Sequence, residues 1–122
     1  MGAFIGLDVG TTSVSAVALD MEAARPLATV SLPHGAGRAG AAPGRAELDL
    51  DALWGAAQEA LGAVAARASG AGSIGGVGVT GQMHGLALVR PDGTPLAPAI
   101  TWQDQRATER DATGKSYLQR FT

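Results

Sequence analysis

The feature that most constrains the fold is the run FIGLDVGTTSVSAVALD, residues 4–20, in which a glycine-threonine turn separates two strand-like segments. Residues 3–7 are almost all apolar, which is typical of a strand buried on both faces. Residues 13–19 come close to strict alternation, which is typical of a strand with one buried face. Residues 27–32 can form a third strand after a short polar connection. The sequence therefore predicts a three-stranded antiparallel meander.

The next segment predicts a loop and then a helix. Residues 34–46 are rich in Gly, Ala and Pro and lack periodicity, so we expect a flexible loop there. Asp49 or Asp51 can then cap the N-terminus of a helix. Ser69 and Gly70 are expected to end it. The helix would carry an apolar face at three- and four-residue spacing, made of Leu50, Leu53, Trp54, Ala57, Leu61, Val64 and Ala65.

Further strands are predicted behind the helix. Residues 74–80 read as a short apolar strand, and residues 86–89 and 99–102 can form two more. Residues 91–93, Pro-Asp-Gly, predict a turn, and residues 105–112 are expected to be helical. A meander followed by a helix and a parallel strand is the opening of a ribonuclease-H-like α/β layer. The predicted fold class is that layer in an incomplete form.

Composition limits the possible functions. The 122 residues carry a formal net charge of −2, so they present no basic footprint for nucleic acid or for an anionic membrane. The absence of cysteine excludes disulfides, thiolate zinc sites and a cysteine nucleophile. No apolar run would span a bilayer and no signal-peptide pattern is present, so we expect a cytoplasmic protein. Aromatic residues make up only 4 %, so the core is expected to rest on Ala, Val, Leu and Ile.

Asp8 and the turn after it form the first candidate site. Gly10 allows a tight turn whose backbone N–H groups can converge on a phosphate, and the hydroxyls of Thr11, Thr12 and Ser13 can add donors. A carboxylate beside phosphates is repulsive unless it holds Mg²⁺, directly or through water, so Asp8 is the candidate metal ligand. A plain hairpin with a capping aspartate explains the same residues.

The run GQMHG forms the second candidate site. Its two glycines let the backbone bend around three side chains. Gln82 and His84 can both donate and accept hydrogen bonds, and Met83 can cover the apolar face of a small ligand. A sugar presents this mixture of surfaces. A loop histidine beside a core methionine is the alternative. A histidine metal site is not expected, because the other histidine, His34, lies in the predicted loop.

The run WQDQR forms the third candidate site. Trp102 can cover a sugar face, Asp104 can accept from a sugar hydroxyl, and Arg106 can hold Asp104 or a negative ligand. The alternative is a helix start, with Asp104 as the N-cap and Arg106 solvated.

In combination, the runs GLDVGTTSV, GVTGQMHG and PAITWQDQR resemble the N-terminal part of the FGGY carbohydrate kinases. Within that family the chain is most similar to the xylulokinase type and next to the sedoheptulokinase type. The resemblance covers Phe4 to about Arg106. It implies an actin-like, ribonuclease-H-like fold and phosphoryl transfer from ATP, with Mg²⁺, to a hydroxyl of a sugar, most of all a ketose such as xylulose.

The resemblance also implies a role for each candidate residue. Asp8 would lie near the Mg²⁺ and the phosphates, and the turn from Gly10 to Ser13 would face the phosphate chain. The residues on the sugar side would line the sugar pocket or lie near it: Gln82, Met83, His84, Trp102, Asp104 and Arg106.

Members of the family are several times longer than 122 residues. Residues 1–122 are expected to be the N-terminal portion of the N-terminal domain, with the general-base aspartate and the adenosine pocket beyond Thr122. Phosphoryl transfer needs many groups positioned at once. The isolated chain is therefore expected to show little or no kinase activity and to need the remainder of the kinase or a second chain.

Three other functions compete with this one. A nuclease of the same fold class needs carboxylates on several elements to hold two metals, and residues 74–80 contain none. An actin-like chaperone or filament ATPase would share the turn at Asp8 but would not require QMHG. A non-catalytic module that binds a sugar or a partner stays open, and it would expose apolar surface.

Overall fold

The computed structural model describes residues 2–38 and 41–121, and the chain divides into two compact units. Unit 1 is made of Met1–Ala36 and Leu50–Gln82, and unit 2 is made of Gly37–Asp49 and Met83–Thr122. The chain therefore leaves the first unit after the meander, returns to it with the long helix, and leaves it again after the parallel strand.

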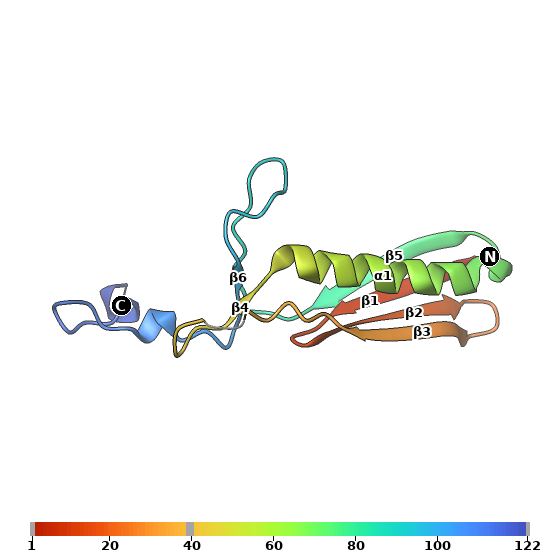
Figure 1. Cartoon of the computed structure of the whole chain (residues 1–122). Coiled ribbons are helices and arrows are strands. Elements are labelled where there is room, and N and C mark those ends of the chain that lie inside the picture. The colour runs from red at the N-terminus through yellow and green to blue at the C-terminus, as the bar shows by residue number, and fades with distance from the viewer. Residues whose placement is uncertain (1, 39–40, 122) are drawn as a thin grey trace. The chain divides into compact units, whose positions relative to one another are not determined.

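Unit 1 contains a four-stranded sheet in the order β3-β2-β1-β5 (Figure 1). Its strands are β1 (Ala3–Val9), β2 (Ser13–Asp20), β3 (Arg25–Pro33) and β5 (Ile74–Gly81). The first three pair antiparallel in succession, and β5 pairs parallel with β1. The predicted meander and the predicted parallel strand are both confirmed. The expected burial of β1 on both faces is wrong, because Phe4 and Asp8 are exposed on the face that the helix does not cover.

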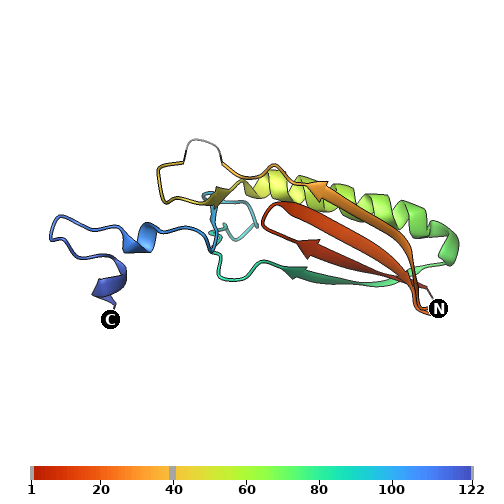
Figure 2. The same ribbon diagram turned by 90° about the horizontal axis from the view of Figure 1, so that it is seen from below.

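Helix α1 (Leu50–Ala68) begins directly after Asp49 and ends in the 3-10 turn η1 (Ser69–Ala71), close to the predicted stop. It covers one face of the sheet, packing on β1, β2 and β3 (Figures 1 and 2). The prediction of Trp54 on the buried face is wrong, since 59 % of that residue is exposed. The face that meets the sheet is formed instead by small residues spaced three or four apart: Ala57, Ala60, Val64 and Ala68.

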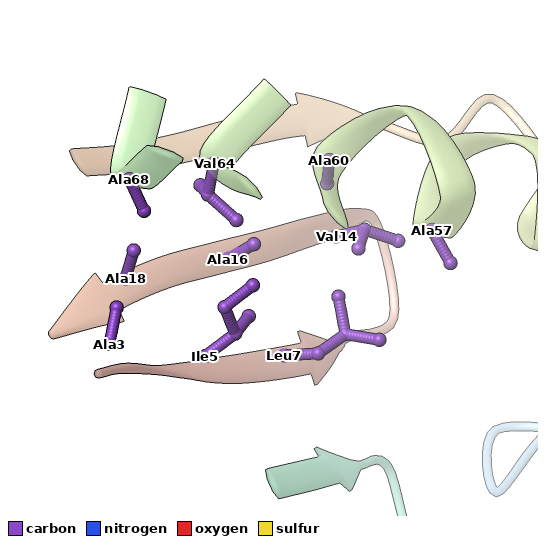
Figure 3. Close-up of a cluster of buried hydrophobic side chains, with 10 residues drawn as sticks. All are labelled: Ala3, Ile5, Leu7, Val14, Ala16, Ala18, Ala57, Ala60, Val64 and Ala68. Atoms are coloured by element: carbon purple, nitrogen blue, oxygen red, sulfur yellow. The ribbon is translucent and has the colours of Figure 1, made fainter. Parts of the chain in front are cut away.

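The core of unit 1 lies between α1 and the strands β1 and β2. Figure 3 shows the helix side chains pointing at those of the two strands. The strand residues of this core are Ala3, Ile5, Leu7, Val14, Ala16 and Ala18. Val14 and Val64 are its largest fully buried side chains. The predicted reliance on Ala, Val, Leu and Ile is confirmed, and small side chains bury little area each, so close packing must supply the stability.

Strand β5 extends the sheet beyond the area that α1 covers. Val77 and Val79 pair in register with the buried Ile5 and Leu7, so they face the same side of the sheet as the helix. Both are nevertheless more than half exposed, Val79 to 69 %. The expected exposed apolar surface is therefore present on this strand.

Unit 2 is built from short pairings. Strands β4 (Glu47–Leu48) and β6 (Ala99–Ile100) are antiparallel. The predicted strand at 86–89 is wrong: its ends form only isolated bridges, from Leu86 to Ile100 and from Val89 to Pro95. Prolines on the partner segment supply no N–H for a continuous ladder. The predicted turn at 91–93 is confirmed, with the Arg90 carbonyl accepting from the N–H of Gly93.

The predicted helix at 105–112 is also wrong. The structure has a 3-10 turn, η2 (Arg106–Thr108), and Glu109 is already extended. The Asp104 carboxylate accepts from the N–H of Arg106, and the Thr108 hydroxyl donates to the Gln105 carbonyl. The first of these bonds caps the turn as it would cap a helix. The helix does not continue because Glu109 is extended and Arg110 forms an antiparallel bridge with Ser116. A second 3-10 turn, η3 (Leu118–Arg120), follows in the same unit.

The segment 34–46 is irregular but is not loose at its start. His34 and Ala36 are buried, and the Arg38 N–H donates to the Glu47 carbonyl. Residues 39–40 lie outside the described residues, so the flexibility of the segment as a whole stays a prediction. Across residues 2–38 and 41–121, no helix combines the length and apolarity needed to cross a membrane.

Candidate functional site

Asp8 lies near the carboxyl end of β1 with its side chain on the sheet face opposite α1. In register it stands between Ser15 on β2 and Thr80 on β5, so two hydroxyl side chains flank the carboxylate on the same face. The three residues line a groove of about 590 Å³ over this face of the sheet. Asp8 is exposed and is available to an incoming ligand.

The turn after β1 is tight. The N–H of Gly10 donates to the carbonyl of Ser13 over 2.9 Å, and a Cβ on Gly10 would lie 3.0 Å from that same oxygen. Glycine therefore suits position 10, because a side chain there would crowd the carbonyl oxygen of Ser13. Thr12 is exposed, whereas Thr11 and Ser13 are half-buried. The turn places two threonines and a serine directly beyond Asp8.

Gln82 follows β5 and lies beside the end of β1. Its N–H donates to the Val9 carbonyl over 3.2 Å, and a Cβ on Gly81 would lie 3.0 Å from that oxygen. The carboxyl ends of parallel neighbours share one edge of a sheet, which is where open α/β sheets bind ligands. Unit 1 therefore brings Asp8, the turn and Gln82 together at one edge. The Oε1 atom of Gln82 is buried and has no hydrogen-bond partner among the described residues.

Met83 and His84 belong to unit 2. Met83 is 73 % exposed. His84 adopts a left-handed backbone with φ of 60°, a conformation that is costly for a residue other than glycine and that clusters at functional sites. The bend was expected at the flanking glycines, which have no positive φ. Gly85 instead serves close packing, since a Cβ there would lie 3.2 Å from the Ile100 carbonyl.

Trp102 lies on the segment that pairs with the one after His84. Leu86 and Ile100 exchange two backbone hydrogen bonds of 2.8 Å each. His84 and Trp102 each lie two residues from this pair, on the two neighbouring segments. Trp102 is more than half exposed. Unit 2 therefore presents an imidazole and an indole from neighbouring segments.

Asp104 and Arg106 bind each other. The side chain of Asp104 is 1 % exposed, and its carboxylate accepts from the Ala46 N–H at 2.7 Å and from the Arg106 guanidinium. The guanidinium also donates to Glu47 at 2.7 Å. Arg106 holds the pKa of Asp104 far below its usual range, and Asp104 in turn raises the pKa of Arg106. The expected pairing of the two residues is present, and a sugar contact by either stays a prediction.

Three residues near the site were missed from the sequence. Ser15 and Thr80 flank Asp8, and their shared face follows from counting alternation outward from Asp8 in each strand. His34 contacts the turn, its Nε2 lying 3.0 Å from the Thr11 carbonyl. The meander predicts this neighbour too, because the end of the third strand lies beside the start of the second.

The residues at the edge fit a magnesium ion held mainly by other ligands. No group of three or more acidic, histidine or cysteine side chains able to hold a metal occurs in the described part of the chain. Mg²⁺ accepts such a site, since it is commonly bound through one or two carboxylates, water and substrate phosphates. Asp8 is the carboxylate at this edge that can serve.

Comparison with known proteins identifies the family. Residues 3–114 match the FGGY family of carbohydrate kinases, N-terminal domain. The chain belongs to this family. Xylulose kinase from Klebsiella pneumoniae is 34 % identical to this FGGY chain over 111 residues, covering 87 % of the chain and 21 % of that relative.

Solved structures agree with this assignment. A xylulose kinase from Brucella ovis has a TM-score of 0.76 at 32 % identity and covers 87 % of this chain and 22 % of its own. The ligand-bound xylulose kinase from Lactobacillus acidophilus has a TM-score of 0.76 at 30 % identity and covers 88 % of this chain and 21 % of its own. The actin-like fold class and the FGGY resemblance are confirmed. The chain spans about a fifth of the length of the curated relatives it matches first.

Proposed function

We propose that this chain supplies the phosphate-binding edge and part of the sugar pocket of a longer kinase that transfers a phosphoryl group from ATP to a ketose hydroxyl. Xylulose is the first candidate substrate. The observation that carries the proposal is the meeting of Asp8, the Gly10–Ser13 turn and Gln82 at the carboxyl edge of β1 and β5. An edge that carries one carboxylate, several hydroxyls and a tight turn is suited to binding phosphates.

On the phosphate side, Asp8 would hold Mg²⁺ through its carboxylate or through water, and Thr11, Thr12 and Ser13 would donate to phosphate oxygens. Mg²⁺, when bound, neutralises the charge of the phosphates. The chain's own contribution is position: β1 fixes Asp8 from one side and the turn fixes the donors next to it. Ser15 and Thr80 keep the surroundings of the carboxylate polar.

On the sugar side, Gln82, Met83 and His84 would contact the substrate in sequence along one loop. Gln82 and His84 offer hydrogen bonds, and the exposed thioether of Met83 offers apolar cover. Trp102 would cover a second face of the sugar. We propose that Asp104 and Arg106 lie near this pocket and hold the segment that carries Trp102.

The isolated 122 residues would not complete the reaction. A base that takes the proton of the attacking hydroxyl and a pocket for adenosine would come from the remainder of the kinase or from a second chain. Without them, the positioning that phosphoryl transfer needs is absent. We also propose a cytoplasmic location, because the proposed reaction uses ATP.

The test is ADP release by the complete protein that carries this sequence, with xylulose, ribulose, sedoheptulose and glycerol offered separately. Asp8→Asn should lower kcat by at least about 100-fold if Asp8 contributes electrostatic stabilisation. Glu59→Gln, at an exposed carboxylate on α1, is the matched control and should leave kcat unchanged. Absence of ADP release with all four sugars would overturn the proposal. Binding of xylulose without ADP release would favour the non-catalytic module.

A further inference from the structure

His34 lies directly after β3, at the end of the meander where the turn between β1 and β2 begins. Ser13 pairs with Pro33 in the β2–β3 ladder, and the next residue outward on each strand brings His34 to Thr12. The backbone N–H of His34 donates to the Thr12 carbonyl over 3.2 Å. Its ring reaches the preceding carbonyl, with Nε2 3.0 Å from the Thr11 oxygen. One residue thus engages two successive carbonyls of the turn.

The imidazole is fixed in one tautomer. The backbone N–H of Ala36 donates to Nδ1 over 3.0 Å, so Nδ1 is an acceptor and carries no proton. The neutral ring therefore carries its proton on Nε2 and donates it to the Thr11 carbonyl. Gly35, with φ of 58°, adopts the left-handed backbone that joins His34 to Ala36 in this arrangement. His34 is only 8 % exposed, and both of its ring nitrogens are hydrogen-bonded.

These contacts set the direction of two N–H groups in the turn. All peptide bonds of the described residues are trans. In a trans peptide the carbonyl and the N–H of the next residue point in opposite directions. Because the carbonyls of Thr11 and Thr12 turn toward His34, the N–H groups of Thr12 and Ser13 point away from it. Successive N–H groups on one side of a turn form an anion-binding concavity.

We infer that His34 is a positioning residue that orients the N–H groups of Thr12 and Ser13 toward a nucleotide phosphate. The inference rests on the proposed function, because that function places phosphates at this turn. It assigns a role to a residue outside the Asp8, QMHG and WQDQR motifs. The role depends on the Nε2 donor in particular, because its hydrogen bond to the Thr11 carbonyl sets the orientation of the peptide between Thr11 and Thr12.

Two conservative variants separate the two ring contacts. His34→Gln can place an amide N–H near the Nε2 position but loses the acceptor for Ala36. His34→Asn can place an amide oxygen near the Nδ1 position but loses the donor to Thr11. The measurements are the calorimetric Kd for ADP with Mg²⁺, the KM for ATP, the KM for xylulose and the Tm, all on the complete protein. ADP is the probe because its binding does not depend on turnover.

The expected result is a split between nucleotide and sugar. His34→Asn should raise the Kd for ADP and the KM for ATP by about tenfold, the loss expected for one hydrogen bond. His34→Gln should stay within about twofold of the unchanged protein. The KM for xylulose should not move in either variant.

Each other outcome has a defined meaning. Equal weakening of ADP binding in both variants, or weakening that follows only the Tm, would leave His34 a structural residue and overturn the inference. Failure of the unchanged protein to bind ADP with Mg²⁺ would overturn it as well. The expected split in ADP binding without phosphorylation of any sugar would support His34 as a positioning residue and overturn the proposed function alone.

Discussion

Units 1 and 2 are stabilised by different forces. Unit 1 joins a ladder of four strands to a helix through an apolar layer of alanine, valine, isoleucine and leucine (Figure 3). The described residues of unit 2 form two strands of two residues each, and the buried ones include the polar Thr101 and Ser116. Its organising contact is the carboxylate of Asp104, bonded to the backbone of Ala46 and to Arg106.

The difference matches the division of labour proposed for the site. A sheet edge holds Asp8 and the phosphate turn rigidly, because strands on both sides fix the backbone. The residues proposed for the sugar lie on irregular segments, as specificity-determining residues commonly do. Variants that attack each kind of stabilisation test whether the two units depend on it as described.

The largest effect is expected in the alanine layer of unit 1. Ala60 is fully buried against the sheet, so Ala60→Asp would bury a carboxylate without a partner. We expect a loss of roughly 3–5 kcal/mol in the free energy of unfolding of unit 1. Denaturant unfolding followed by the exchange of amides in β1 and β2 would measure it.

The control for that change is Ala66→Asp, on the exposed side of the same helix. Its cost should be below about 1 kcal/mol, reflecting helix propensity alone. If both variants lost the same stability, burial against the sheet would not be what stabilises unit 1.

In unit 2 the largest effect is expected from Asp104→Ala. The change leaves the Ala46 N–H without its acceptor and the Arg106 guanidinium with Glu47 alone, and it should cost about 2 kcal/mol in that unit. Faster exchange of the Leu86 and Ile100 amides would report it. Gln103→Ala, at an exposed neighbour, should leave exchange unchanged. Unchanged exchange in Asp104→Ala would show that the carboxylate does not organise the unit.

The contrast between the two units explains which elements could be predicted from the sequence. The strands and the helix of unit 1 follow from polar and apolar periodicity, because burial on one face is what selects those residues. Trp54 escaped that rule, since a small face of Ala57, Ala60 and Val64 approaches the sheet and a large indole does not fit there. The spacing of apolar residues predicts the helix, but it does not predict which residues lie at the centre of the buried face.

Unit 2 was predicted poorly for a physical reason. Its backbone direction depends on hydrogen bonds between distant groups, such as the Asp104 carboxylate with the Ala46 N–H. No local pattern encodes such a bond. The apparent helix at 105–112 has suitable residues and Asp104 caps its first turn, but Arg110 pairs with Ser116 and the helix does not continue. The candidate motifs were found because they are local. His34 was missed because its contact with Thr11 becomes visible only when the predicted strands are paired with each other.

A smaller effect is expected from acid. Unit 2 contains three carboxyls whose pKa is lowered in the fold, Asp92, Asp104 and Asp111, and their first causes are the Thr94 N–H, the Arg106 guanidinium and the Thr113 hydroxyl. A lowered pKa gives stability that is present above the unfolded pKa of about 3.9 and is lost as the pH falls through the folded value.

Within unit 1, Asp20 is the carboxyl among the described residues with a resolved lowering of the pKa, caused first by the Ala23 N–H. As the pH falls below about 4, the amides of unit 2 should therefore lose protection from exchange before those of β1 and β2, after correction for the intrinsic exchange rate. Equal loss in both units would contradict the assignment of the acid-sensitive contacts to unit 2.

The smallest effect is expected at Ala24 in unit 1 and His84 in unit 2, the described residues other than glycine that adopt a left-handed backbone. Replacing either by glycine relieves backbone strain of about 1–2 kcal/mol and costs part of it in unfolded-state entropy, for a net gain of about 0.5 kcal/mol. Both variants should therefore raise the stability of their own unit slightly. Only His84→Gly should also raise the KM for the sugar, because Ala24 lies in a turn without a proposed ligand. A gain in stability at His84 with an unchanged KM would mean that its strain serves the backbone path and not the substrate.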